Sequence, residues 1–135
     1  MPAVDASVTV KWFVEEPGSA SARALRAAHI HGELQLIAPE LLVYEVTNVL
    51  LRHPRFEPSE IDQAIDALYD LQLELIVPTA DVVHAALRLA IRYRLTFYDA
   101  LYVALAQQLD MDLITADRRL HDRVSALPFV HLLSP

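Results

Sequence analysis

The sequence predicts an α/β protein in which one parallel sheet carries helices on both faces. Short apolar runs alternate with longer amphipathic runs along the 135 residues, which is the pattern of successive strand–helix units. Pro39, Pro58 and Pro78 fall at boundaries between these runs, where proline opens a helix or ends a strand. No repeat, low-complexity tract or linker interrupts the chain. We therefore expect residues 1–135 to form a single domain.

Five short apolar runs are predicted to be strands: residues 3–5, 35–38, 74–77, 113–115 and 130–133. In an open α/β sheet, ligands bind outside the carboxyl ends of the strands. Asp5 ends the first of these runs, and Asp117 lies two residues beyond the end of the fourth. The two acids are therefore expected at strand ends on the same side of the sheet.

Seven amphipathic runs between the strands are predicted to be helices: residues 6–14, 20–31, 40–53, 59–72, 80–93, 97–109 and 118–126. Three acids could serve as ordinary parts of the helix ends. Asp5 and Asp117 stand where N-caps of the first and last helices belong. Thr96 and Asp99 fit a capping box, with Asp in place of the usual Glu. These local roles remain open as alternatives to a shared site.

Two acids are predicted to face the interior side of their helices. Glu45 lies in "PELLVYEVTNVLLRHP", on a stripe with core-type leucines and Val49 at helical spacing. Asp99 lies inside the apolar run "LTFYDALYVALAQQ", on the same face as Tyr102 and Val103. An ionised carboxylate in an apolar setting is costly unless it finds a partner. Such a partner for Glu45 could be local, because Asn48 and Arg52 follow on the same helix.

The four acids together suggest a divalent cation. If they converge, each pair at ~5 Å repels by about 3 kcal/mol at an effective dielectric constant near 20, and a protein of ordinary stability would need protons or a cation to relieve this. Oxygen ligands without His or Cys match Mg²⁺ or Mn²⁺ better than zinc or copper. Water on such an ion is a nucleophile suited to a phosphodiester.

The composition excludes several other kinds of site. The chain has no cysteine, so disulfides, zinc–thiolate sites and thiol nucleophiles are absent. Its two glycines are too few for Walker-type or dinucleotide-binding loops, and there is no G-x-S-x-G elbow. The "HIH" run at residues 29–31 falls at a helix end before Gly32, where the helix dipole favours histidine. This structural role is preferred over metal binding.

No signal peptide or membrane span is visible in the sequence. The N-terminus lacks a basic region followed by an apolar one, and no uncharged apolar run approaches the roughly 18 residues of a membrane span. The absence of cysteine suits a reducing compartment. We therefore expect a cytoplasmic protein with no membrane partner.

The four acidic positions lie in stretches that resemble the PIN-domain ribonucleases, particularly the VapC-type toxins of prokaryotic toxin–antitoxin pairs. The matching stretches are "VDASVTVKWFVEE", "PELLVYEVTNVLLR", "LTFYDALYVALAQ" and "LITADRRL", in order across nearly the whole chain. The first and third are the most specific. On this resemblance, the acidic cluster is Asp5, Glu45, Asp99 and Asp117. Their polar neighbours would be Thr115, Ser7 and Asn48.

The resemblance implies a three-layer α/β/α fold around a parallel sheet. It also implies endonucleolytic cleavage of single-stranded or loop RNA, dependent on Mg²⁺ or Mn²⁺, with the carboxylates holding the metal and a metal-bound water attacking phosphorus. Members of the family commonly form homodimers and are silenced by a cognate antitoxin. A further acid sometimes found just beyond the "TAD" stretch is replaced here by Arg118 and Arg119.

The net charge of −7 is unusual for a protein that binds nucleic acid, because neutralisation of phosphates normally supplies much of the affinity. Local phosphate contacts could come from arginines, although each of these is equally well explained as a solvated helix end. The candidates are Arg52, Arg55, Arg118, Arg119 and Arg123.

Two other α/β functions that use strand-end aspartates each lack a residue that they require. A phospho-accepting receiver domain needs a lysine late in the sheet, and the only lysine is Lys11. A haloacid-dehalogenase-type phosphatase needs Asp-x-Asp at the first strand, where this chain has "DAS". The main alternative is a PIN fold that has lost catalysis and serves as a binding module or scaffold.

Overall fold

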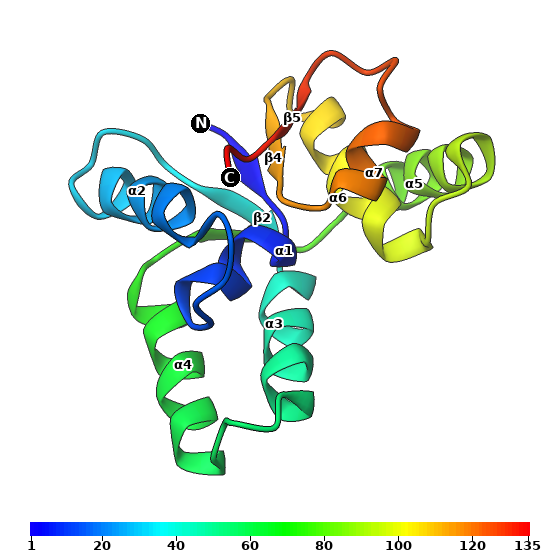
Figure 1. Cartoon of the computed structure of the whole chain (residues 1–135). Helices are drawn as coiled ribbons and strands as arrows, with labels where there is room; N and C mark the ends of the chain where they lie inside the picture. The colour runs from blue at the N-terminus through cyan, green and yellow to red at the C-terminus, as the bar shows by residue number, and fades with distance from the viewer.

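A five-stranded parallel sheet forms the centre of the computed structural model, which describes residues 1–135 (Figure 1). Its strands are β1 (Ala3–Val4), β2 (Ile37–Pro39), β3 (Glu74–Ile76), β4 (Leu113–Thr115) and β5 (Val130–Leu132). They lie in the order β3-β2-β1-β4-β5, and every neighbouring pair is parallel. The five predicted strands and the parallel sheet are therefore confirmed.

The second strand differs from its predicted bounds of 35–38, because β2 includes Pro39 and is in register with β3 there, Pro39 opposite Ile76. Proline cannot donate to a sheet ladder. The next amide, Glu40 N–H, donates instead to the Ile76 carbonyl at 2.9 Å, which lets the strand end on proline.

Helices cover both faces of this sheet, so the three-layer prediction is confirmed. They are α1 (Ala6–Thr9), the 3₁₀ helix η1 (Val10–Trp12), α2 (Ser19–Ile30), α3 (Leu41–Arg52), α4 (Pro58–Asp70), α5 (Ala80–Tyr93), α6 (Phe97–Gln108) and α7 (Arg118–Arg123). Figure 1 shows α2, α3 and α4 on one side of the sheet and α5, α6 and α7 on the other, with α3 and α4 projecting together away from the strands. None of the helices combines the length and the apolar character needed to cross a bilayer.

The first predicted helix, residues 6–14, is divided into α1 and η1. Val8, Thr9 and Val10 are β-branched, which lowers helix propensity. The Thr9 hydroxyl also donates back to the Asp5 carbonyl at 3.1 Å. The buried Trp12 then ties η1 to α2 by donating its indole N–H to the Ala22 carbonyl at 2.8 Å, so Trp12 is a packing residue.

The core is built around α6, in which every residue from Ala100 to Ala106 is buried. This helix packs against α5 and the sheet strands β1, β2 and β4. Full burial of a valine or leucine side chain stabilises the fold by roughly 1.5–3 kcal/mol. The apolar run around Asp99 is therefore explained by the central place of α6, which reaches the surface in its first turn and at Gln107 and Gln108.

His29, in the last turn of α2, joins three elements through its ring. Its Nδ1 accepts from Leu36 N–H at 3.1 Å, and its Nε2 lies 2.6 Å from the Leu71 carbonyl. Because Nδ1 accepts, Nε2 carries the proton and donates to Leu71. The expected structural role of the "HIH" run is confirmed for His29, although it acts through these tertiary hydrogen bonds.

Replacing His29 with leucine should destabilise the protein by about 2–4 kcal/mol, because Leu36 N–H and the Leu71 carbonyl would both lose their partner in a buried setting. Urea unfolding followed by circular dichroism measures this. The exposed neighbour His31 gives the control, and His31→Leu should change stability by no more than about 0.5 kcal/mol. Equal effects of the two substitutions would contradict the assignment.

Candidate metal centre

The site lies where the strand order changes direction. From β1 the chain proceeds to β2 and β3 on one side, and later to β4 and β5 on the other. The carboxyl ends of β1 and β4 border this switch point, which is where open α/β sheets bind ligands. Val4 pairs with Ile114, so the residues that follow them, Asp5 and Thr115, lie side by side.

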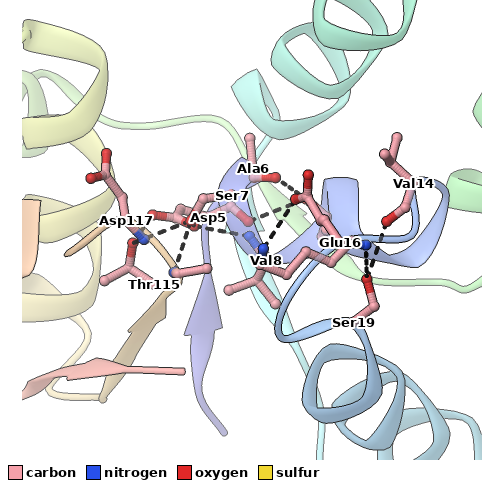
Figure 2. A network of polar contacts seen from close by, with 12 residues as sticks. Asp5, Ala6, Ser7, Val8, Val14, Glu16, Ser19, Thr115 and Asp117 are labelled. Atoms are coloured by element: carbon pink, nitrogen blue, oxygen red, sulfur yellow. Dashed lines mark hydrogen bonds and ion pairs between the residues drawn. The ribbon is translucent and has the colours of Figure 1, made fainter. Parts of the chain in front are cut away.

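Asp5 is held at both of its carboxylate oxygens. Its side chain is buried, with 5% of the residue exposed. Oδ1 accepts from the Ser7 hydroxyl at 2.5 Å and from Val8 N–H at 3.3 Å, whereas Oδ2 accepts from the Thr115 hydroxyl at 2.5 Å. Figure 2 shows this group at the end of β1. Asp5 is therefore both the N-cap of α1 and the buried centre of a larger network.

The two hydroxyls connect Asp5 to the turn between β4 and α7. Ser7 Oγ accepts from Ala116 N–H at 2.9 Å, and Thr115 Oγ1 accepts from Asp117 N–H at 3.1 Å. Each hydroxyl thus accepts from a backbone amide of the turn and donates to a different oxygen of Asp5. Ser7 and Thr115 orient the buried acid and hold the backbone of Asp117.

Asp117 also caps α7, as the local alternative predicted. One of its oxygens accepts from Arg119 N–H at 3.0 Å and from Leu120 N–H at 3.2 Å. Of the predicted capping box at α6, only one half forms, in which the Thr96 hydroxyl accepts from Asp99 N–H at 3.1 Å. The reciprocal bond from Thr96 N–H to the Asp99 carboxylate is absent, so this carboxylate is not committed to the cap.

Glu45, on α3, has a hydrogen-bond partner on another helix. The hydroxyl of Tyr102, on α6, donates to Glu45 Oε1 at 2.6 Å. Tyr102 is buried, with 1% of the residue exposed. The alternative in which Glu45 pairs locally with Asn48 or Arg52 is not observed, because its hydrogen-bond partner comes from another helix. The position of Tyr102 three residues after Asp99 was the available signal.

A cleft of about 480 Å³ brings the four predicted acids together. Its polar lining consists of Asp5, Glu45, Asp99 and Asp117 with Ser7, Lys11, Glu16 and Tyr102. Val49, which was expected in the core, is 42% exposed and lines the same cleft. Asn48 is not brought to this site: it is exposed and lines a separate hollow between α3 and α4.

Burial is the main cause of the raised pKa values of Asp5, Glu45 and Asp99. It raises the pKa of Asp5 to about 6, against a partial opposing effect of the Ser7 and Thr115 hydroxyls and a further increase from the charge of Asp99. Burial also raises the pKa of Asp99, followed by the charge of Asp117. Repulsion between carboxylates, which the sequence led us to expect as the principal cost, is therefore secondary to desolvation.

Asp99 is nevertheless electrostatically linked to all three other acids. Its charge contributes to the raised pKa values of Asp5 and Glu45, in both cases after burial and hydrogen bonding. Asp117 in turn raises the pKa of Asp99, while the Thr96 hydroxyl and Arg123 lower it. Asp99 therefore occupies the electrostatic centre of the cluster.

The donor set fits a hard divalent cation in its chemistry. The cleft is lined by five carboxylates, the four predicted acids and Glu16, without histidine or cysteine, and oxygen ligands of this kind suit Mg²⁺ or Mn²⁺. As the side chains lie, no three acidic or histidine groups form a set that could hold one ion. The site thus has the ligand types for such a metal without a closed three-ligand arrangement.

Comparison with known proteins identifies the family. Residues 3–127 match the family model of the PIN domain. The chain belongs to the PIN domain family. It is similar to Ribonuclease VapC3 of Pyrobaculum aerophilum, with 35% identity over 128 residues that cover 92% of this chain and 95% of that protein. This relationship makes the chain a PIN domain of the VapC type, and the resemblance noted in the sequence is confirmed.

Solved structures support the same fold. VapC20 of Mycobacterium tuberculosis, a toxin that cleaves the sarcin–ricin loop, superposes with a TM-score of 0.73 at 18% identity, covering 96% of this chain and 97% of that one. A toxin–antitoxin complex from Klebsiella pneumoniae gives a TM-score of 0.71 at 19% identity, covering 97% of this chain and 96% of that one. At these identities the likeness establishes the PIN fold alone.

In the absence of metal, this PIN domain should lose stability as the pH rises through about 6. Asp5 has a pKa of about 6 when folded, against an ordinary value of 3.8, so the folded state holds the proton more tightly. The protonated carboxyl contributes fully to the stability of the fold below pH 3.8, and this contribution is lost as the carboxyl ionises. Two pKa units correspond to about 3 kcal/mol.

Urea unfolding in EDTA at several pH values between about 4 and 8 measures this loss. Asp5→Asn should flatten the pH dependence, because its amide does not ionise. Asp62→Asn, at an exposed position of α4, should leave the slope of the wild type. If the stability of Asp5→Asn and of wild type changes with pH at the same slope, burial of Asp5 does not cause the pH dependence.

Proposed function

We propose that this chain is a Mg²⁺- or Mn²⁺-dependent endoribonuclease that cleaves single-stranded or loop RNA and acts as the toxin of a toxin–antitoxin pair. The observation that carries the proposal is that the four predicted acids, which come from separate elements, line one cleft: Asp5, Glu45, Asp99 and Asp117. The name of the relative VapC3, a ribonuclease, supports RNA as the substrate. The loop-cleaving activity named for VapC20 supports a loop or single strand within it.

In this proposal, Asp5, Glu45, Asp99 and Asp117 hold the metal. When bound, the ion supplies an activated water and stabilises the charge that develops on the phosphate. Ser7 and Thr115 keep Asp5 in one orientation through their hydrogen bonds to its two oxygens. Tyr102 orients Glu45 in the same way, and orientation of ligands by a second layer of hydrogen bonds is usual at metal sites.

Arg123 is the arginine best placed to contact RNA next to Asp99. It is exposed, donates to the Arg94 carbonyl, and its charge lowers the pKa of Asp99. An arginine beside the acids can bind a phosphate oxygen of the substrate. This supports a local source of positive charge in a protein whose net charge is −7.

The alternative function is a catalytically inactive PIN-fold scaffold. The absence of a closed three-ligand group favours it. The raised pKa values of Asp5, Glu45 and Asp99 favour the enzyme, because a bound cation would relieve the cost of their ionisation.

The antitoxin is proposed to bind the hollow between α3 and α4. This hollow has a volume of about 430 Å³ and is lined mainly by apolar residues, among them the exposed Tyr44, Leu51 and Tyr69. Because α3 also carries Glu45, a peptide seated there can extend into the acid cleft and block it. The toxin–antitoxin complex that shares the fold supports a partner of this kind.

A homodimer is proposed through α5. Val83, Leu87 and Ile91 are exposed on one side of this helix at spacings of four residues. Such a stripe can pair with its own copy about a two-fold axis, since an isologous interface uses the same surface twice.

Asp99→Asn should reduce RNA cleavage at least about 100-fold, because it removes the carboxylate to which the other three acids are coupled. The measurement is cleavage of loop-containing RNA with Mg²⁺ or Mn²⁺, beside an EDTA reaction. Asp62→Asn, with its exposed carboxylate on α4, is the matched control and should retain activity.

Cleavage that persists in Asp99→Asn would point to a contaminating nuclease and leave Asp99 with its helix-end role. If wild type does not cleave, calorimetric titration with Mn²⁺ separates the two candidate functions. Metal binding that Asp99→Asn abolishes favours a selective nuclease, and no binding favours the scaffold.

Leu87→Glu should weaken the homodimer at least about tenfold, because it puts a charge at the centre of the apolar stripe. Sedimentation velocity over a range of protein concentrations measures the shift towards monomer. Leu109→Glu changes another exposed leucine, beyond the end of α6, and should leave the mass distribution unchanged. A wild type that is monomeric at every concentration would refute the dimer.

A further inference from the structure

The acid cleft continues into a second hollow that the proposed chemistry does not use. This hollow, of about 330 Å³, shares Lys11, Glu16 and Ala116 with the lining of the cleft and adds Gly18 and Arg118. Residues 132–135 also line it. It therefore lies beside the four acids and brings the chain's only lysine together with an arginine.

Lys11 is held in a fixed position between the two hollows. Its side chain is 13% exposed, and its Nζ donates to Glu16 Oε1 at 3.0 Å. Its stem packs against Gly18, where an added Cβ would lie 3.3 Å from Lys11 Cε. Gly18 also has a φ of +91°, which favours glycine. The absence of a side chain at Gly18 thus leaves room for the lysine.

The charge of Lys11 is not used to neutralise the acid cluster. After burial, the charged side chains that shift the pKa of Asp99 are Asp117 and Arg123. Lys11 is not among the causes of the raised pKa values of Asp5 or Glu45 either. Its only ionic partner is Glu16, whose side chain is 38% exposed, and a pair of this exposure contributes little to stability.

We propose that the second hollow is a phosphate subsite, in which Lys11 and Arg118 bind the backbone phosphate of a nucleotide adjacent to the one that is cleaved. The inference rests on the proposed function, since it takes RNA as the ligand. The acids of the cleft repel a polyanion, and a cationic pair beside them fixes the strand in one register. Lys11 is a positioning residue in this arrangement, and Glu16 holds its ammonium until the phosphate replaces the carboxylate.

The test uses the salt dependence of RNA binding. For single strands, log K falls with log salt by about 0.7 per neutralised phosphate. A fluorescein-labelled pool of random-sequence, single-stranded RNA is titrated in EDTA, which blocks metal-dependent cleavage, at salt concentrations from about 50 to 200 mM. Lys11→Met keeps the stem that packs on Gly18 and removes the charge. It should lower the slope by about 0.7 and weaken binding about tenfold.

Two controls separate phosphate binding from a structural role. Glu16→Gln breaks the same ion pair but leaves the ammonium, so the slope should stay at the wild-type value and the affinity should hold or increase. Arg88→Gln removes an exposed charge on α5, outside both hollows, and should change nothing. Arg118→Gln should repeat the effect of Lys11→Met.

Cleavage kinetics provide a second readout. Lys11→Met should raise KM about tenfold and leave kcat within about threefold, because the lysine binds substrate away from the reacting phosphate. If wild type binds and cleaves RNA but Lys11→Met keeps the wild-type slope and KM, the subsite is overturned and the nuclease stands. Equal losses in Lys11→Met and Glu16→Gln would show a structural ion pair and also overturn it. A wild type with no salt-dependent RNA binding would overturn the subsite, whereas the proposed nuclease is judged separately by metal-dependent cleavage.

Discussion

The buried carboxylate of Asp5 is the constraint on which the rest of the site depends. It lies at the end of β1, the central strand, and both of its oxygens accept from hydroxyls that in turn accept from the turn after β4. A buried acid without such donors would be severely destabilising. The hydrogen bonds therefore do two things at once: they make burial of Asp5 tolerable, and they set the backbone position from which Asp117 projects.

The two layers of helices meet this centre from opposite sides of the sheet. On one side α3 supplies Glu45, and on the other α6 supplies Asp99 from its exposed first turn. The bond from Tyr102 to Glu45 joins these layers. Since α6 is buried from Ala100 to Ala106, the core itself determines where the exposed first turn begins and its acid appears. Packing of the core and geometry of the cleft are consequently inseparable in this fold.

Much of the fold and of the candidate site could be predicted from local patterns. The alternation of apolar and amphipathic runs predicted the order of all the strands and helices, because hydrophobic period reflects which residues each element buries. The capping roles of Asp5 and Asp117 were also local, since an N-cap bonds only to amides two or three residues ahead. The helix bounds at 6–14 were wrong, because three consecutive β-branched residues and the Trp12 contact shortened α1.

The sequence by itself determined which residue types were available: four candidate carboxylates, three near strand or helix ends and Glu45 within a helix, together with no thiols and a single lysine. Only the tertiary structure decided how they meet. It selected Tyr102 as the partner of Glu45, placed Asn48 at a different hollow, and set Lys11 between two clefts. The physical reason is that hydrophobic periodicity reports only which face of an element is buried. Contacts between elements depend on how the layers pack, and desolvation of an acid depends on everything that surrounds it.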